Sequence, residues 1–474
     1  MLMTSPLVTQ AEVTDIDLNS LVVRAIDSHP LVGSAISEQK ATQEGISAAK
    51  RNLLPAPSIS SAYSKGDDVV TQLSIRQPLW TGGRLTANVN QSIFDDKAAI
   101  ENVFEKQNEV AKSTISAWQS YITAITMQRV YQENLGQLEE FEAMMQRRVA
   151  QGVSARIELE LLTNRILQRQ SDYQAAKEQE RIATSRLEQL MGEPLAEGMA
   201  YSVPKLDTWV QKAKGQAVNY EKMVFDEASF RNATVVKQFF QAESAKQKME
   251  ADKAANYPTV YAQYARSYNH STHDGDGKFS LGMNYEPGSG FSNLALARAS
   301  QARVNSIIQS QEAARRTVME NIQTQYQKFA SAKSKELSLI AATAGSQIVV
   351  DSYKRQFIAG RKSWLEVLNA VREHGDNQVE LATTRANMLG AFYNLQVDLG
   401  VMPWQEFQFN RKPEPLFHPL DPVDKWLNNQ QQVNLPESIK STPKTLKNIP
   451  NHLRDLTDKL NLDKVPKKLK KMVD

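Results

Sequence analysis

The chain has 474 residues, a net charge of +3 and no cysteine. Its mean hydropathy of −0.47 is low for a large compact core, and its long stretches of Ala, Gln, Glu, Lys, Arg and Leu favour long helices. The weak charge gives no support for binding to nucleic acid. The absence of cysteine excludes disulfides, thiol catalysis and cysteine metal sites.

No run of about 18 apolar residues is present, so the sequence predicts no transmembrane helix. We interpret residues 1–11 as a residual signal segment, with Thr9 and Ala11 at the small positions of a cleavage site and maturation near Glu12. An ordinary frayed terminus explains the same residues equally well.

The first helical region covers residues 15–54, and its periodicity is interrupted at His29-Pro30. Two short strands follow between about 58 and 80. The second strand alternates apolar and polar residues, which predicts one apolar and one polar face. After Gly82-Gly83, one helix of about 65 residues is predicted, roughly 100 Å long at 1.5 Å per residue.

That helix contains a single glycine, Gly136, and no proline. Its heptad-like apolar spacing is typical of coiled-coil elements. A break around Gly152 precedes a return helix over 155–190, which Gly192 and Pro194 end.

The second half repeats this order. We expect a helix over 217–255, strands within 258–286, a long helix over 293–358, a break at Gly360 and a return helix over 364–399. The polar segment His270–Gly277 contains two histidines and two aspartates, but a polar hairpin tip explains it better than a metal site.

The two halves are related by a duplication. Leu73 aligns with Leu281 and Glu158 with Glu366, an offset of 208 positions that holds without a gap over about 120 residues. We therefore divide the chain into four parts. These are the residual signal segment 1–11, a first repeat 12–208 (helical hairpin about 84–191), a second repeat 209–405 (helical hairpin about 292–399) and a loosely ordered Pro/Lys-rich tail 406–474 with a weak amphipathic helix at 451–460.

Four strands are too few to close a barrel, and open sheet edges are not tolerated in lipid. If these are membrane strands, several chains must share one barrel, and three copies would supply twelve strands. The alternative from pattern alone is a water-soluble helical protein with two minor hairpins.

The order of the predicted elements, their duplication and three motifs together resemble the TolC family of outer-membrane channel-tunnel proteins. The motifs are Gln77-Pro-Leu-Trp-Thr-Gly-Gly83 after the first strand pair, Val149-Ala-Gln-Gly152 through Leu159, and Phe357-Ile-Ala-Gly360 through Asn369. The resemblance covers residues 18–405. The second repeat departs from the first motif, because it reads Glu286-Pro-Gly-Ser-Gly-Phe291.

The resemblance implies a mainly α fold with a small β part that trimerises into a 12-stranded β-barrel and a periplasmic α-helical tube. It implies a homotrimer in the outer membrane of a Gram-negative bacterium, in contact with lipid, with no cofactor and no enzymatic activity. A periplasmic adaptor would join it to an inner-membrane ABC transporter or proton-driven pump.

Two export roles remain open. Type I secretion of a protein such as an adhesin or toxin is favoured, because the chain lacks the lipid-anchor cysteine of the lipoprotein branch of efflux channels. Multidrug efflux of small molecules is the alternative, and a soluble coiled-coil scaffold is a third hypothesis of a different class.

The resemblance also assigns candidate site residues near the two helical turns. Adaptor contacts are expected at Gly152, Val153, Gly360 and Arg361. A constriction of the periplasmic entrance is expected at Glu158, Glu366 and Asn369, where the family carries a second acidic residue in place of Asn369. Carboxylates crowded in a narrow mouth repel each other and attract cations. Candidate salt-bridge partners are Arg147, Arg148, Lys354, Arg355 and Lys362.

Overall fold

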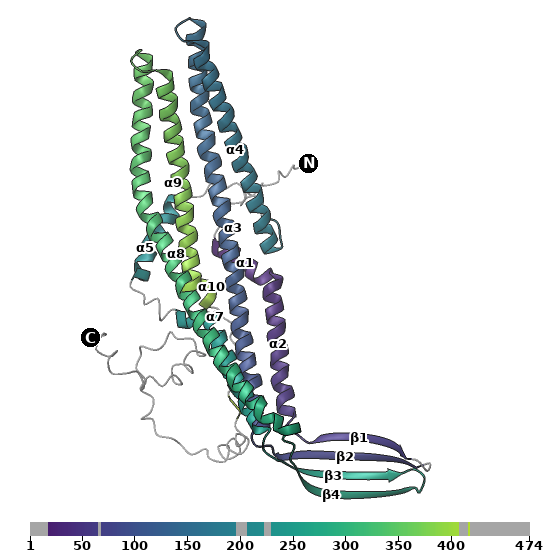
Figure 1. The fold of residues 1–474 in the computed structure, drawn as a ribbon. Coiled ribbons are helices and arrows are strands. Elements are labelled where there is room, and N and C mark those ends of the chain that lie inside the picture. Colours follow the sequence, from purple (N-terminus) through teal and green to yellow (C-terminus); the bar gives the residue numbers. More distant parts are fainter. Residues whose placement is uncertain (1–17, 65–67, 196–205, 222–228, 407–415, 418–474) are drawn as a thin grey trace, which may run out of the picture. The chain divides into compact units, whose positions relative to one another are not determined.

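The computed structural model describes residues 18–64, 68–195, 206–221, 229–406 and 416–417 (Figure 1). The chain forms two compact units. The first comprises residues 1–39, 99–238 and 309–406, and the second comprises 40–98, 239–308 and 407–474. The signal segment 1–11 and the helix expected at 451–460 lie outside the described residues.

In the first repeat the helices are α1 (Leu18–Ser28), α2 (Pro30–Arg51), α3 (Arg84–Ala150) and α4 (Arg156–Met191). The predicted break at His29-Pro30 is confirmed. Pro30 is the first residue of α2, where a missing N–H costs nothing. The Nδ1 atom of His29 accepts a hydrogen bond from the Leu31 N–H at 3.2 Å.

In the second repeat the helices are α5 (Leu206–Glu221), α7 (Ala233–Ala254), α8 (Ser292–Ile358), α9 (Trp364–Leu399) and α10 (Pro403–Glu406), with a 3₁₀ turn η1 at Ser289–Phe291. The single helix predicted over 217–255 is wrong. Asn232 starts a new helix, because its side-chain oxygen accepts the Thr234 N–H at 3.1 Å and so caps α7.

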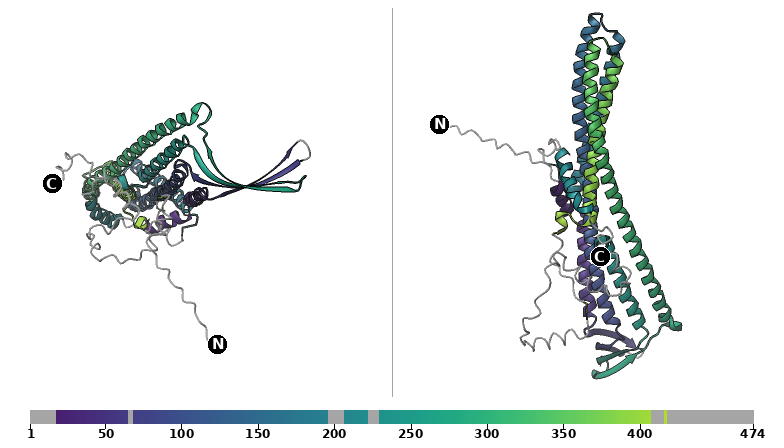
Figure 2. Two further views of the ribbon diagram at one scale, coloured as in Figure 1. Left: turned by 90° about the horizontal axis from the view of Figure 1, so that it is seen from below. Right: turned by 90° about the vertical axis from the view of Figure 1, so that its left-hand side faces the viewer.

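The duplication is visible in the helix bounds. Helices α3 and α8 each contain 67 residues, and α4 and α9 each contain 36. Each of the four bounds in the second repeat lies 208 positions after its counterpart. Each long helix folds back into its shorter partner as a hairpin, and the two hairpins lie alongside one another in the first unit (Figure 2).

The second unit contains a four-stranded antiparallel sheet in the order β1 (Ala56–Ser64), β2 (Asp68–Trp80), β3 (Thr259–Asn269) and β4 (Asp274–Asn284). The pairing of β2 with β3 joins the two repeats. Ala56 pairs with Arg76, and the equivalent pair in the second hairpin is Thr259 with Asn284. The paired residues are 20 positions apart in the first hairpin and 25 positions apart in the second, so the second hairpin is longer by five residues.

One face of this sheet is mainly apolar across all four strands, with Arg266 opposite Leu73 as a charged member. Ile59 pairs with Leu73, and Tyr264 pairs with both Ile75 and Phe279. These side chains are exposed in the single chain, as are Leu281 (69%) and Met283 (70%). The opposite face is polar, with Arg76 donating to Gln263 and lying over the Tyr261 ring. The predicted alternation is therefore confirmed.

Three apolar clusters lie in the first unit, and the two larger ones bear on the site. The shaft core surrounds Trp118 and Phe392 and includes residues of α1, α3, α4, α5 and α9. The tip core surrounds Trp364 and Phe141 and includes residues near the turns of both hairpins. Both cores draw on both repeats, so the two hairpins are held together by burial of apolar surface.

Within the part of the chain that the structure describes, no helix is long and apolar enough to cross a lipid bilayer. Leu416 and Phe417 are the two described residues beyond α10. The Phe417 backbone exchanges hydrogen bonds with the Asn90 side chain of α3 at 2.8 and 3.3 Å, within the second unit. This part of the predicted loose tail is thus anchored.

Candidate functional site

The two helical turns have the same backbone conformation. After α3, Gly152 has a φ of 72°, and its N–H donates to the Val149 carbonyl at 3.0 Å while the Val153 N–H donates to the Arg148 carbonyl at 2.8 Å. After α8, Gly360 has a φ of 73°, with equivalent bonds to Phe357 and from Arg361 to Gln356. This is the Schellman arrangement that ends helices at a left-handed residue.

Both glycines are required by backbone conformation and not by space, because a Cβ at either would meet no atom within 4 Å. Gly152, Val153, Gly360 and Arg361 are all exposed. The four residues predicted to contact an adaptor therefore lie at open turns, while the contact itself stays a prediction.

In the second turn, Glu366 is engaged by its own helix. One carboxylate oxygen accepts the Ser363 N–H at 3.0 Å and the Ser363 hydroxyl at 2.9 Å, and the other pairs with the Lys362 ammonium at 2.6 Å. The bond from the Ser363 N–H to Glu366, three residues on, belongs to a capping box at the start of α9.

These contacts hold Glu366 in its charged form. Lys362, followed by the N–H and hydroxyl of Ser363, lowers the pKa of Glu366 from 4.5 to about 2. The pKa of Lys362 is raised in turn, chiefly by the same hydrogen bond. Within one chain, the Lys362 ammonium therefore neutralises the Glu366 carboxylate, and it would do so in any entrance that Glu366 lines.

In the first turn, the equivalent helix start is uncapped. Ala155 is the residue before α4 and provides no side-chain hydrogen bond. The carboxylate of Glu158 is half-buried and has no hydrogen-bond or ion-pair partner among the described residues. Ser154 instead accepts a hydrogen bond from the Arg148 Nε at 3.1 Å, which closes the turn on the α3 side.

The five predicted cationic partners are divided among different contacts. Among the described residues, only Lys362 pairs with a predicted entrance carboxylate. Lys354 lies 3.9 Å from a Glu140 oxygen and over the Phe141 ring, and Arg148 stacks on Phe357 with 4.7 Å to the ring centroid. Arg147 and Arg355 are exposed and have no ion pair within the described ranges. Asn369 is exposed on α9.

The sequence reasoning missed the aromatic cluster behind the second turn. Trp364 is 1% exposed, with its ring 5.6 Å from that of Phe141 and 5.1 Å from that of Phe357. One signal in the sequence could have identified this cluster. The second repeat has Trp364 where the first has Arg156, and a tryptophan at the start of a helix is expected to pack against other apolar side chains. Ser363-x-x-Glu366 was likewise a legible capping signature.

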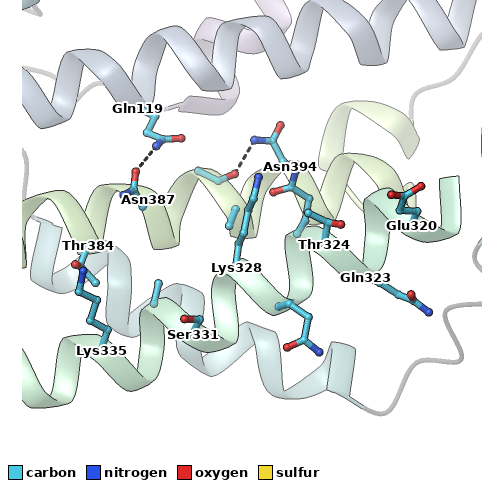
Figure 3. Close-up of a pocket in the computed structure, with 15 residues that line it drawn as sticks. Gln119, Glu320, Gln323, Thr324, Lys328, Ser331, Lys335, Thr384, Asn387 and Asn394 are labelled. Carbon is cyan, nitrogen blue, oxygen red and sulfur yellow. Dashed lines mark hydrogen bonds between the residues drawn. The ribbon is translucent and has the colours of Figure 1, made fainter. Parts of the chain in front are cut away.

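A separate groove of about 920 Å³ lies among α3, α8 and α9 (Figure 3). Its walls are mainly amides and lysines. Gln119 donates to Asn387 at 2.7 Å, and Asn394 donates to the Gly390 carbonyl at 2.8 Å. The groove offers hydrogen bonds to polar solutes, and its described lining residues include no nucleophile paired with a base. Among the described residues, no group of three or more His, Asp or Glu is placed to hold a metal ion.

A comparison with protein families decides the identity of the chain. The family model described as "Outer membrane efflux protein" matches residues 21–193 and again 224–401, which together are more than half of the chain. The chain belongs to the outer membrane efflux protein family. The family is one of transport channels of the outer membrane with a helical periplasmic domain, so this member is an outer-membrane transport protein and not an enzyme.

Solved structures show the same fold. The outer membrane protein VceC of Vibrio cholerae is 14% identical, with a TM-score of 0.70 over 81% of this chain and 96% of that chain. The MtrE outer membrane channel of Neisseria gonorrhoeae is 14% identical, with a TM-score of 0.66 over 81% and 88%. The CmeC outer membrane channel of Campylobacter jejuni is 11% identical, with a TM-score of 0.65 over 82% and 86%. No curated protein sequence matches the chain. The predicted resemblance to TolC-like channels is confirmed.

Proposed function

We propose that three copies of this outer membrane efflux protein assemble into one exit duct. Twelve strands would close a barrel in the outer membrane, and the helical hairpins would form a tube in the periplasm. The observation that carries this proposal is the sheet. It presents a mainly apolar face across all four strands, and β1 and β4 have no neighbour on their outer edges within the described residues.

An open edge exposes unpaired backbone groups, which lipid does not tolerate. Pairing β4 of one copy with β1 of the next would satisfy both edges, and the exposed apolar face of Ile59, Tyr264, Phe279 and Leu281 would then contact hydrocarbon. The polar face, with Arg76 and Gln263, would line the interior.

The length of the helices supports the tube. Sixty-seven residues of α3 or α8 extend roughly 100 Å at 1.5 Å per residue. We keep the four-part division of the chain as a proposal, with the repeats 12–208 and 209–405 each supplying one strand pair and one hairpin.

At the entrance, three copies would bring Glu158, Glu366 and Asn369 around one axis. Glu158 would contribute the unneutralised charge, since Lys362 accompanies Glu366. The cationic side chains Arg147, Arg148, Lys354 and Arg355 would lie just behind this ring. The turns at Gly152 and Gly360 would receive a periplasmic adaptor that joins the duct to an inner-membrane ABC transporter or proton-driven pump.

The test of the duct is conductance in a planar bilayer. The purified protein is expected to form cation-selective channels, and Glu158→Gln is expected to reduce the selectivity more than Glu366→Gln. Glu373→Gln, an exposed carboxylate of α9 away from the turns, is the control. A protein that is monomeric without detergent and forms no channel contradicts the proposal.

The cargo is a separate part of the proposal. The family description names efflux, which supports export of small molecules. Type I secretion of an adhesin or toxin is the other cargo role that we consider. Deletion of the gene distinguishes the two: loss of a large protein from the medium supports secretion, whereas increased sensitivity to several drugs with an unchanged set of secreted proteins supports efflux.

A further inference from the structure

A layer with several buried polar side chains separates the tip core from the shaft core. On α3 the shaft core ends at Ile125 and the tip core begins at Leu135, and on α9 the tip core ends at Val371 and the shaft core resumes at Ala386. Ten residues of helix correspond to about 15 Å. We define the polar belt by four buried polar residues, one on each helix: Asn134, Arg169, Ser346 and His374.

The polar belt is buried, and its members form hydrogen bonds with other side chains. Its members are 3–9% exposed. His374 Nδ1 lies 3.0 Å from the Ser346 hydroxyl, which also receives the Asn377 amide at 3.4 Å. The Asn134 amide lies 3.5 Å from the Gln378 oxygen. Hydrogen bonds between polar side chains can be replaced by hydrogen bonds to water, whereas close-packed apolar contacts cannot.

A cavity of about 440 Å³ opens at the same level among α3, α4 and α9. Arg169 lies at its wall, 3.4 Å from an Asp172 oxygen and 3.6 Å from an Asp376 oxygen. The volume and the charged lining suit bound water.

Each of the two long helices contains one glycine, and both glycines lie beside the belt. They are Gly136 on α3 and Gly345 on α8, and their positions in the two repeats are one residue apart after the offset of 208. An added Cβ would meet no atom within 4 Å at either position, so packing does not require glycine there. Glycine in a helix interior weakens the helix, and Gly/Ser pairs such as Gly345-Ser346 are common sites of kinks.

We propose that the polar belt, with Gly136 and Gly345, is a hinge on which the tip core moves as one body relative to the shaft core. Both hairpins would bend at the same level, because α3 and α8 carry their weak points at equivalent positions. The tip core, packed around Trp364, would keep the two turns together during this movement. The hinge rests on the proposed function in one respect, since it would let the entrance widen.

The experiment uses alanine to stiffen the hinge without creating a cavity or a clash. Gly136→Ala with Gly345→Ala is compared with Gly33→Ala with Gly45→Ala, two glycines of α2 that also have no atom within 4 Å of an added Cβ. The full chain is followed by hydrogen–deuterium exchange. We expect peptides over 129–139 and 340–349 to exchange faster than peptides over 112–124. Gly136→Ala with Gly345→Ala, called the belt variant, should slow the exchange of the belt peptides about fivefold per glycine. Gly33→Ala with Gly45→Ala, called the α2 variant, is the control.

Movement of the tip is measured separately. Because the chain has no cysteine, Gln151→Cys adds a single spin-label site at the first turn. In a trimer, pulsed electron paramagnetic resonance measures the distances between the spin labels of the three copies. The belt variant is expected to narrow the distance distribution, and the α2 variant is expected to leave it unchanged.

Failures of the two proposals are distinguishable. Absence of any label-to-label signal contradicts the trimer. A clear signal whose width is the same in the belt variant, the α2 variant and the parent chain overturns the hinge. The hinge is also overturned if the belt peptides exchange no faster than those of the shaft core.

Discussion

The two helical turns have the same backbone, but their side chains stabilise them in different ways. Gly152 and Gly360 share one conformation, and the helices that follow them have the same length. The second turn adds a capped helix start at Ser363 and a buried Trp364, whereas the first has Ala155 and the exposed Arg156 at these positions. The comparison teaches that duplication preserved the geometry of the turn while its stabilising contacts became concentrated in the second copy.

The largest expected effect comes from the aromatic core. Trp364→Ala removes a fully buried side chain from between Phe141 and Phe357, and should lower the free energy of unfolding of the tip by about 3–5 kcal/mol. Arg156→Ala, at the equivalent position, is the control, and its side chain is 86% exposed. Hydrogen exchange at the two turns measures both. Equal effects at the two positions would show that the tips are stabilised alike.

The next effect tests what the turns share. Gly152→Ala and Gly360→Ala each force a Cβ into the left-handed region, at roughly 1–2 kcal/mol. Because neither site has a close neighbour, the two costs should be the same within error. Thermal unfolding of the two single variants provides the measurement. A much larger cost at one turn would mean that the surroundings of that glycine, and not its backbone, dominate.

A smaller effect tests the cap. Ser363→Ala should destabilise the start of α9 by about 1 kcal/mol, and Ala155→Ser should stabilise the start of α4 by a similar or smaller amount. Local exchange of the first-turn amides of α4 and α9 reports the two changes. If Ala155→Ser has no effect, Arg148 and Ser154 already satisfy the first turn by another route.

The smallest effect is a dependence on pH. The pKa of Glu366 is lowered to about 2 in the folded chain from an ordinary value of 4.5. Its contribution to stability is therefore complete above about 4.5 and is lost as the pH falls toward 2. In melting curves between pH 2 and pH 6, Glu366→Gln should flatten this dependence slightly. Glu158→Gln serves as the control. If Glu158→Gln flattened the pH dependence of the melting temperature more than Glu366→Gln did, the dependence could not be assigned to Glu366.

Part of the site was predictable and part was not. The glycines of the turns and the pair of equivalent glutamates were identified from the sequence, because helix stops and an internal repeat are local patterns. The partners of those side chains were not identified. Arg148 was expected to face a carboxylate, but it stacks on Phe357 of the other hairpin. That contact depends on how the two hairpins pack, which spacing along one helix does not specify.

The sequence by itself determined the duplication, the lengths of the four long helices and the alternation of the strands, since each depends on hydrophobic periodicity and on Gly and Pro at the ends. The tertiary structure alone decided that β2 pairs with β3 in one sheet, that Asn232 divides the predicted helix and that a polar belt separates two apolar cores. These features join residues far apart in the chain or use side chains whose role depends on their neighbours.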